Sequence, residues 1–449
     1  MKFSNYNVIL DENEDNILCN TMTGHIFKID DRVKNLIQNN DIKNFSESEI
    51  ALLTERGIIT EDNIDEIRIL EHENMKVNFS ATGLSLTLLL TTSCNLNCTY
   101  CYQGAGNVHG NKLTDDIRSS IFKFIKRTVE EKNLKYVSIM LFGGEPLLYL
   151  KDNVYFLKEV QEFCMSTNRG FVTMIITNGV LINDDIINVL HDLNCKYIQI
   201  TLDGVKEIHD ERRLYKNGNG SFDEVISGIK KVLNSDKLAN PLIRINIDKI
   251  NYQRTFELIE YLAKENLLSC SIDFGIVRAD SSANSTYTDF CFQNEELGDI
   301  LEPLWEKVSS LKGDFFIRPV RRNSFCGMYS NTAFTISPIG EVYKCWELYD
   351  KEHIIGSLNK EGNLSTIQYS LSNWMSRSFR DNPECLLCQY LPMCSGGCGS
   401  VSYGKFGTYH KPGCFKTISV FNKQILWQYR TLQKLHNDNY QKQDINLSC

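Results

Sequence analysis

This 449-residue sequence predicts an α/β fold: a partial (β/α)6 TIM-like barrel flanked by two smaller units. From Leu84, strand-length apolar runs alternate with amphipathic helical stretches, which is typical of a parallel sheet with crossover helices. Residues 1–80 carry 16 acidic and 8 basic side chains, so the net charge of −8 is concentrated there. Beyond about residue 300 the alternation stops and seven closely spaced cysteines follow. We therefore expect domains over residues 1–80, 84–300 and 301–449.

The first unit reads as a small α+β module. Two strands, NVIL and HIFKI, are expected with polar turn regions between them, and a short helix is expected from Asp31. Ser46 and Glu49 have the spacing of a capping box before the helical sequence IALLTER, and Gly57 is placed to end that helix. The polar stretch EHENMKVNFSATG is expected to lead out of the module as a connecting segment.

Six apolar runs then supply the strands of the barrel. They lie at residues 84–92, 136–142, 171–177, 197–203, 242–248 and 271–277. Amphipathic stretches lie between them, including those that follow Thr114 and Asn251. Six such units close only part of a barrel, and ligands are expected at the carboxyl ends of its strands. The C-terminal region is expected to be loop-rich and to finish with the helix TISVFNKQILWQYRTLQKLH and a polar tail.

Composition excludes several classes of function. No apolar run is long enough to span a membrane, and the N-terminus has no secretory signal, so a cytoplasmic protein without membrane contact is expected. The acidic balance argues against nucleic acid as a partner. Sixteen cysteines without a signal peptide favour metal ligation over disulfides.

Three cysteines directly follow the first barrel strand: Cys94, Cys98 and Cys101. Three thiolates at this spacing can hold three corners of a cubane iron–sulfur cluster, whereas a complete set has four. The fourth iron is then open to a substrate or cofactor, which points to catalysis. The alternatives are a zinc knuckle or three incidental thiols, although zinc sites usually pair one CxxC with another.

Polar or glycine-rich motifs follow the next three strands, and together they predict one ligand-binding rim. They are Gly143, Gly144 and Glu145 in GGEP, Asn178 in TNG, and Thr201 in TLDG followed by Arg213 in HDERR. Each motif has a plainer interpretation: a strand-to-helix turn for GGEP, an ordinary Asn-Gly turn for TNG, and a solvated helix face for HDERR. With the cysteine triad, four consecutive strands are each followed by such a motif, and four in order are expected by chance much less often than one.

A second cysteine set lies in the C-terminal region: Cys326, Cys345, Cys385, Cys388, Cys394, Cys398 and Cys414. Two zinc ribbons would require eight ligands, so seven cysteines fit two iron–sulfur clusters with one ligand missing better. The other cysteines are expected to be small buried side chains, with Cys195 and Cys270 in the core. Cys291 is kept as an outside candidate for the missing ligand.

These motifs in this order resemble the radical S-adenosylmethionine (radical SAM) superfamily. The cysteines from Cys326 to Cys414 resemble its SPASM extension, and the two resemblances cover roughly residues 84–415. Residues 1–80 are similar, more weakly, to the winged-helix-like peptide-recognition module of enzymes that modify ribosomally made peptides.

The resemblance implies a role for each matching position. Cys94, Cys98 and Cys101 would hold the catalytic [4Fe–4S] cluster, and SAM would bind its fourth iron. Contacts to SAM are implied for Tyr102 near the adenine, for Gly143, Gly144 and Glu145 at the methionyl amine, for Asn178 in its TNG motif, for Thr201 at the ribose and for Arg213 at the methionyl carboxylate. Two auxiliary [4Fe–4S] clusters are implied, one on Cys385, Cys388, Cys394 and Cys414 and the other on Cys326, Cys345 and Cys398.

The implied activity is a peptide maturase in which SAM is cleaved reductively and a 5′-deoxyadenosyl radical removes hydrogen from a peptide. An open auxiliary iron would favour thioether cross-linking, with a leader peptide carrying Lys or Arg held by residues 1–80 and flavodoxin or ferredoxin as electron donor. No general base is assigned. The alternatives are an enzyme of the anaerobic sulfatase-maturating type, against which the long segment before Cys94 argues, and a non-catalytic iron–sulfur or zinc protein.

Overall fold

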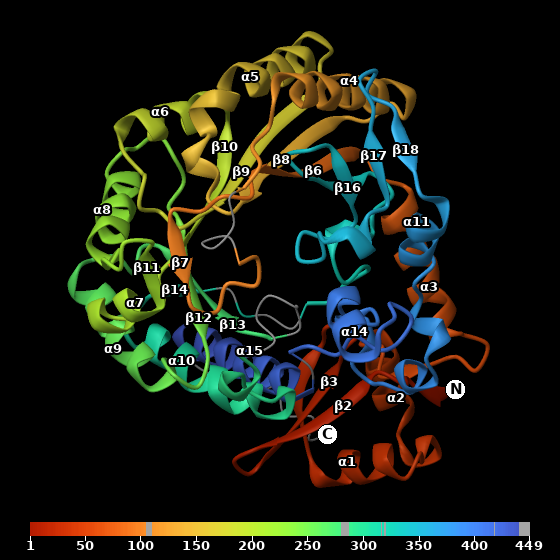
Figure 1. Cartoon of the computed structure of the whole chain (residues 1–449). Helices are drawn as coiled ribbons and strands as arrows, with labels where there is room; N and C mark the ends of the chain where they lie inside the picture. The colour runs from red at the N-terminus through yellow and green to blue at the C-terminus, as the bar shows by residue number, and fades with distance from the viewer. Residues whose placement is uncertain (105–109, 280–286, 316, 318–319, 417, 440–449) are drawn as a thin grey trace.

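The computed structural model describes residues 1–104, 110–279, 287–315, 317, 320–416 and 418–439. A strongly curved sheet forms the body of the molecule, with helices on its outer face (Figure 1). No helix among these residues has the length and apolar character needed to cross a membrane. Cys449 and the expected polar tail lie outside the described residues.

The six predicted barrel strands are confirmed, and neighbouring strands pair in parallel in sequence order. They are β6 (Gly83–Thr91), β8 (Tyr136–Gly143), β9 (Gly170–Thr177), β10 (Cys195–Thr201), β12 (Leu242–Ile247) and β13 (Ser271–Ile276). The apolar side chains of β6 are almost fully buried, as expected for a parallel strand covered on both faces. All six carboxyl ends therefore lie on one rim.

Amphipathic helices cover the convex face of this sheet (Figure 1). They are α4 (Asp115–Glu131), α5 (Leu150–Ser166), α6 (Asp184–Asp192), α7 (Lys206–Arg212), α8 (Phe222–Leu233), α9 (Tyr252–Lys264) and α10 (Leu297–Ser310). The helices expected after Thr114 and Asn251 are α4 and α9, and the Thr114 side chain caps α4 by accepting from the N–H of Ile117. Apart from α7, whose buried side chains are His209 and Arg212, their buried faces join the sheet in one continuous core.

The sheet continues beyond the barrel strands, which the sequence did not predict. β14 (Asp314–Phe315) pairs in parallel with β13, and β15 (Ala333–Ile336) pairs in parallel with β6. β16 (Glu341–Tyr343), β17 (Gly356–Leu358) and β18 (Leu364–Thr366) extend that side as an antiparallel ribbon. Cys345 follows β16, which is antiparallel to β15 and therefore runs away from the rim.

The N-terminal segment differs from its prediction in two places. Its main sheet has three strands, β2 (Asn7–Glu12), β3 (Asp15–Asn20) and β4 (Ile26–Ile29), where two were expected. The polar stretch expected as a connector is instead part of α3 (Glu66–Phe79). The remaining elements are β1 (Lys2–Phe3), β5 (Ile59–Thr60), α1 (Asp31–Gln38) and α2 (Glu47–Glu55).

Local signals in this segment are confirmed. The helix expected from Asp31 is α1, and α2 begins with a capping box between Ser46 and Glu49. Gly57 follows α2 with a φ of +76°, a left-handed conformation that glycine adopts without strain. The Cα partners of β2 and β3 run from Asn7 with Asn20 to Glu12 with Asp15, which leaves two residues in the connecting turn.

The C-terminal region is made of short elements and one long helix, as predicted. Its helices are α11 (Gln368–Met375), α12 (Pro383–Leu386), α13 (Leu391–Cys394), α14 (Gly399–Phe406) and α15 (Ile418–Asn439), and its 3-10 turns are Gly327–Tyr329, Lys351–His353 and Phe379–Asp381. Further 3-10 turns lie earlier in the chain, at Ile42–Asn44, Pro146–Leu148 and Asn294–Glu296. α15 packs between α10 and the sheet of β2, β3 and β4.

Candidate active site at the rim of the barrel

The cysteine triad lies on the loop after β6, and its first member, Cys94, is three residues past the end of that strand. Part of this loop is the strand β7 (Leu96–Cys98), which pairs antiparallel with β11 (Arg213–Tyr215). In this register Cys98 lies opposite Arg213, so the pairing brings the motif after the fourth barrel strand to the triad after the first. The sequence showed both motifs without predicting this pairing.

Gly143 and Gly144 allow the triad loop to approach the end of β8. A Cβ on Gly143, whose φ is +129°, would lie 2.1 Å from the carbonyl oxygen of Thr91, and a Cβ on Gly144 would lie 2.2 Å from that of Ser93. The backbone N–H groups of Gly144 and Glu145 donate to these two carbonyls at 3.0 and 2.9 Å. The close approach expected for a ligand is thus made, in the structure, by the chain itself.

Glu145 is fully buried and its carboxylate holds the following motif in place. It accepts hydrogen bonds from the Thr177 hydroxyl and the Asn178 N–H, both at 2.7 Å, and from the N–H of Leu147 at 2.9 Å. Burial raises the pKa of this carboxyl, and the three hydrogen bonds oppose that rise. Its side chain does not line the pocket described below, so contact with a ligand is expected instead from its neighbours Gly143 and Gly144.

Asn178 connects the TNG motif to the triad. Its side-chain Nδ2 donates to Asn95 at 2.8 Å and lies 3.8 Å from the sulfur of Cys94, whose thiol also accepts from the N–H of Leu96 at 3.4 Å. Hydrogen bonds of this kind to sulfur are among the features that adjust the potential of a cluster held by cysteines.

One pocket joins the triad to the rim motifs. Its volume is about 380 Å³, within the range of pockets that hold small molecules and cofactors. Of the residues predicted from sequence it is lined by Cys94, Cys98, Cys101, Tyr102, Gly143, Gly144, Asn178, Thr201 and Arg213. Glu347, from the loop after Cys345, lines the wall of the same pocket.

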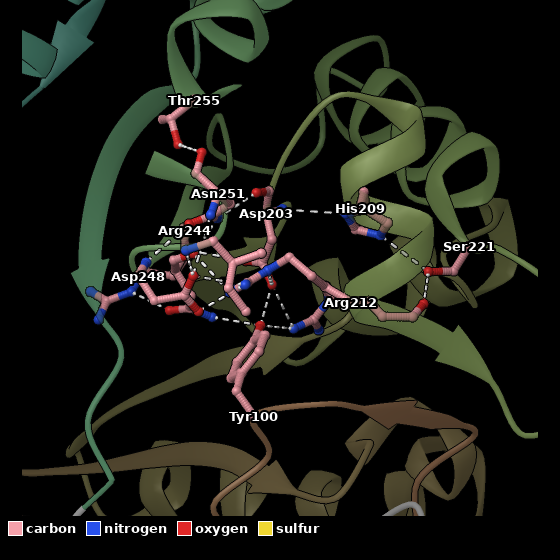
Figure 2. Close-up of polar contacts among 12 residues, drawn as sticks. Tyr100, Asp203, His209, Arg212, Ser221, Arg244, Asp248, Asn251 and Thr255 are labelled. Atoms are coloured by element: carbon pink, nitrogen blue, oxygen red, sulfur yellow. Dashed lines mark hydrogen bonds and ion pairs between the residues drawn. The ribbon is translucent and has the colours of Figure 1, made fainter. Parts of the chain in front are cut away.

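A buried charged network under this pocket was missed in the sequence, and Figure 2 shows it. Tyr100, between two cysteines of the triad, donates its hydroxyl proton to Asp203 and accepts from Arg213 at 2.5 Å and from Asn246 at 3.1 Å. The guanidinium of Arg212 lies over the Tyr100 ring, 4.8 Å from its centre. The solvated helix face that was one interpretation of HDERR is therefore wrong for both arginines, which are almost fully buried.

Each arginine of this network has an acidic partner. Arg212 pairs with Asp248 at 2.7 Å, and Arg213 lies 3.6 Å from Asp203. Burial alone would lower the pKa of Arg212, but the nearby carboxylates of Asp203 and Asp248 keep it above its usual range. Among the described residues the Nε of Arg213 is buried without a hydrogen-bond partner, so an anionic group in the pocket would satisfy it.

His209 is a neutral side chain that connects Asp203 of the buried network with Ser221 (Figure 2). Burial, and then the charge of Arg213, lower its pKa to about 3. Its Nδ1 accepts from the N–H of Asp203 at 3.2 Å, so Nε2 carries the proton and faces the Ser221 hydroxyl at 3.1 Å. Ser221 in turn donates to the carbonyl of Arg213 at 2.6 Å.

The triad has the chemistry of a metal-binding donor set. Burial raises the pKa of Cys94 to about 12 and that of Cys98 to about 11, so without a cation these thiols stay protonated at neutral pH. Tetrahedral zinc with sulfur ligands at 2.3 Å would bring them about 3.8 Å apart. Within the described ranges, the one set of ligand atoms that converges within 4.8 Å is Asp350, Glu352 and His353, and no three thiols do so.

The seven later cysteines separate into two groups by the neighbours that perturb their pKa values. Burial is the largest cause of the raised pKa of Cys394, which is about 12, and the neighbouring thiols of Cys414, Cys385 and Cys388 raise it further. Cys398 likewise raises the pKa of Cys326 and of Cys345. These are the two sets that the resemblance implied. We call Cys326, Cys345 and Cys398 the three-thiol set, and the other four the four-thiol set.

The remaining described cysteines behave as core residues. Cys195 and Cys270 are buried, as predicted, and all described cysteines are free thiols. Cys291 packs with Val277 and Tyr287, and its sulfur contacts the carbonyl of Tyr287 at 3.5 Å.

Comparison with known proteins agrees with this geometry. Residues 88–237 match the family model described as the radical SAM superfamily. The chain contains a radical SAM domain. A cysteine-type anaerobic sulfatase-maturating enzyme of Clostridium novyi is 25% identical over 367 residues, which cover 76% of this chain and 96% of the relative.

Two solved structures share the fold of this chain. Native anSMEcpe with bound AdoMet and the Cp18Cys peptide has a TM-score of 0.61 and 17% identity, covering 80% of this chain and 100% of its own. SuiB of Streptococcus suis bound to precursor peptide SuiA has a TM-score of 0.54 and 16% identity, covering 93% of this chain and 99% of its own.

Proposed function

We propose that this radical SAM enzyme is a peptide maturase that forms a thioether cross-link in a ribosomally made precursor. The observation that carries the proposal is the single pocket shared by the triad, the rim motifs and Glu347 from the loop after Cys345. Such a pocket lets one substrate contact the triad and Glu347, which lies two residues after Cys345 of the three-thiol set. SuiB, whose structure holds its precursor peptide SuiA, supports a peptide as substrate.

The chain's own residues would bind and orient SAM. Cys94, Cys98 and Cys101 would hold a [4Fe–4S] cluster, which when reduced supplies the electron that cleaves SAM to methionine and a 5′-deoxyadenosyl radical. Arg213, with its unpartnered Nε, would take the methionyl carboxylate. Thr201 would contact the ribose and Tyr102 the adenine, while Gly143 and Gly144 offer backbone groups to the amine. Glu145 would act through Asn178, whose position it fixes.

The auxiliary thiols complete the electron balance of a thioether reaction. One hydrogen atom leaves a substrate carbon for the deoxyadenosyl group, one proton leaves the cysteine thiol, and the C–S bond forms with one electron left over. The four-thiol and three-thiol sets would hold [4Fe–4S] clusters that accept single electrons. A flavodoxin or ferredoxin would supply the electron for the next SAM.

Residues 1–80 are proposed to hold the leader of the precursor, by strand addition to a free edge of the sheet of β2, β3 and β4. Their excess of acidic side chains favours a leader with Lys or Arg. anSMEcpe leaves a fifth of this chain without a counterpart, whereas SuiB leaves far less, which favours a precursor-peptide enzyme over a sulfatase-maturating one.

Anaerobic reconstitution and mass spectrometry test this function. We expect about 12 iron atoms per chain for three cubane clusters, and a co-expressed Cys-containing precursor from the same gene neighbourhood should lose two hydrogens and one free thiol. A product with formylglycine would favour the sulfatase-maturating alternative. Zinc in place of iron would contradict the proposal and favour the non-catalytic one.

A further inference from the structure

Glu347 lies where the three-thiol set meets the active-site pocket. Its side chain is 33% exposed and lines the pocket that also contains the triad. It follows Cys345 by two residues, and its backbone N–H donates to the Cys345 sulfur at 3.4 Å. The loop therefore folds around that sulfur and turns the carboxylate toward the pocket.

The Glu347 carboxylate is fixed between the segments that carry Cys345 and Cys398. Its Oε2 accepts from the hydroxyl of Ser400, two residues after Cys398, at 3.0 Å, and from Arg278 at 2.5 Å. Arg278 comes from the rim, two residues after β13. In the part of the chain that the structure describes, the second oxygen, Oε1, accepts no hydrogen bond.

The same carboxylate acts electrostatically on all three thiols. Burial is the main cause of the raised pKa values of Cys326, Cys345 and Cys398, and the charge of Glu347 raises each of them further. The hydrogen bonds to the Cys345 sulfur and from Ser400 thus place a negative oxygen donor between the segments that carry Cys345 and Cys398.

We propose that Glu347 is the fourth protein ligand of the auxiliary cluster, binding iron through Oε1. This inference rests on the proposed cluster at the three-thiol set. A carboxylate is a harder ligand than a thiolate, and iron–sulfur sites favour soft sulfur donors. A substrate cysteine thiolate that reached this iron past Glu347 would replace the carboxylate, with no change of oxidation state and with the thiol proton released to solvent. Arg278 and Ser400 hold the displaced carboxylate.

The test uses the full-length chain with the triad replaced by alanine, so that the auxiliary clusters alone contribute to the spectra. Glu347→Ala, Glu347→Gln and Glu347→Cys are compared in this background by iron content, by the electron paramagnetic resonance of the reduced protein and by redox titration. Glu352→Ala is the matched control, because Glu352 is on the same connecting segment but pairs with Tyr403 instead of the thiols.

We expect iron to be retained in all variants and the signal of one auxiliary cluster to shift in each Glu347 variant but not in Glu352→Ala. Glu347→Cys should move the midpoint potential to a more negative value, since nitrogen ligands in place of thiolates raise cluster potentials and a thiolate in place of carboxylate acts in the opposite sense. Full iron with unchanged signals in all Glu347 variants would overturn the assignment alone. A parent protein that binds no iron would overturn the proposed auxiliary clusters with it.

Discussion

The residues most consequential for the site, after the cysteines themselves, are the paired charges beneath them. Arg212 and Asp248 are almost fully buried and contact each other directly, and Tyr287 donates to the same carboxylate at 2.9 Å. Removing one partner of a buried ion pair leaves an uncompensated charge in a medium that solvates it poorly.

Asp248→Asn should therefore lower the free energy of unfolding by about 3–5 kcal/mol. Asp192→Asn is the control, because its pair with Lys158 is half-exposed and such pairs contribute about 0–1 kcal/mol. Urea unfolding of the reconstituted protein measures both. Equal losses in the two variants would show that the buried network does not stabilise the fold.

His209 predicts a pH dependence of stability. Its pKa is about 3 in the folded chain and has its ordinary value near 6.5 in the unfolded chain, so between these values the unfolded state binds one more proton. The contribution of His209 to stability is fully present above its unfolded-state pKa of about 6.5. It decreases as the pH drops below that value, by up to about 1.4 kcal/mol per pH unit. Unfolding measured between about pH 7 and pH 5 should show a shallower slope in His209→Gln. An unchanged slope would contradict the neutral assignment.

At the scale of elements, the rim depends on how closely the triad loop approaches β8. Gly144→Ala places a methyl group against the carbonyl of Ser93 and should displace the loop that carries Cys94. We expect this variant to lose about 4 iron atoms per chain, the content of one cubane cluster. Gly218→Asn is the control, since a Cβ there meets no atom within 4 Å and asparagine tolerates the left-handed φ of +86° at this position. Full iron content in Gly144→Ala would show that the loop tolerates the shift.

The sequence predicted elements well where their local pattern was strong. Parallel strands such as β6 and β8 are continuous apolar runs, and each rim motif follows its strand directly, so their common location could be inferred. β3 was missed because its apolar run, Ile17 to Cys19, is short. α3 was missed because it is polar and is held by long-range contacts such as that between Ser4 and the buried carboxylate of Glu66.

Contacts between distant segments explain the remaining omissions. Tyr100 meets Asp203 across about a hundred residues, and no periodicity in the sequence indicates that meeting. The seven later cysteines could be grouped only through the family resemblance, whereas Glu347 became visible once β16 placed it beside the pocket.

At the scale of the whole molecule, α15 ties the acidic module to the rest of the chain. Ile425 is fully buried against Val8 and Cys19 of the N-terminal sheet and against Tyr390 and Met393 near the four-thiol set. Ile425→Ala should lower the free energy of unfolding by about 2–5 kcal/mol because it leaves a cavity at this junction. Leu432→Ala, at a 37% exposed position of the same helix, is the control. Equal stability of the two variants in urea unfolding would contradict the junction.

The central claim is that Cys94, Cys98 and Cys101 form the centre at which SAM is cleaved. Its most direct test is the yield of 5′-deoxyadenosine from SAM under reducing, anaerobic conditions, with the wild-type chain and Cys94→Ala compared at equal auxiliary iron content. We predict 5′-deoxyadenosine from the wild type and none above background from Cys94→Ala. Undiminished cleavage by the variant would contradict the account.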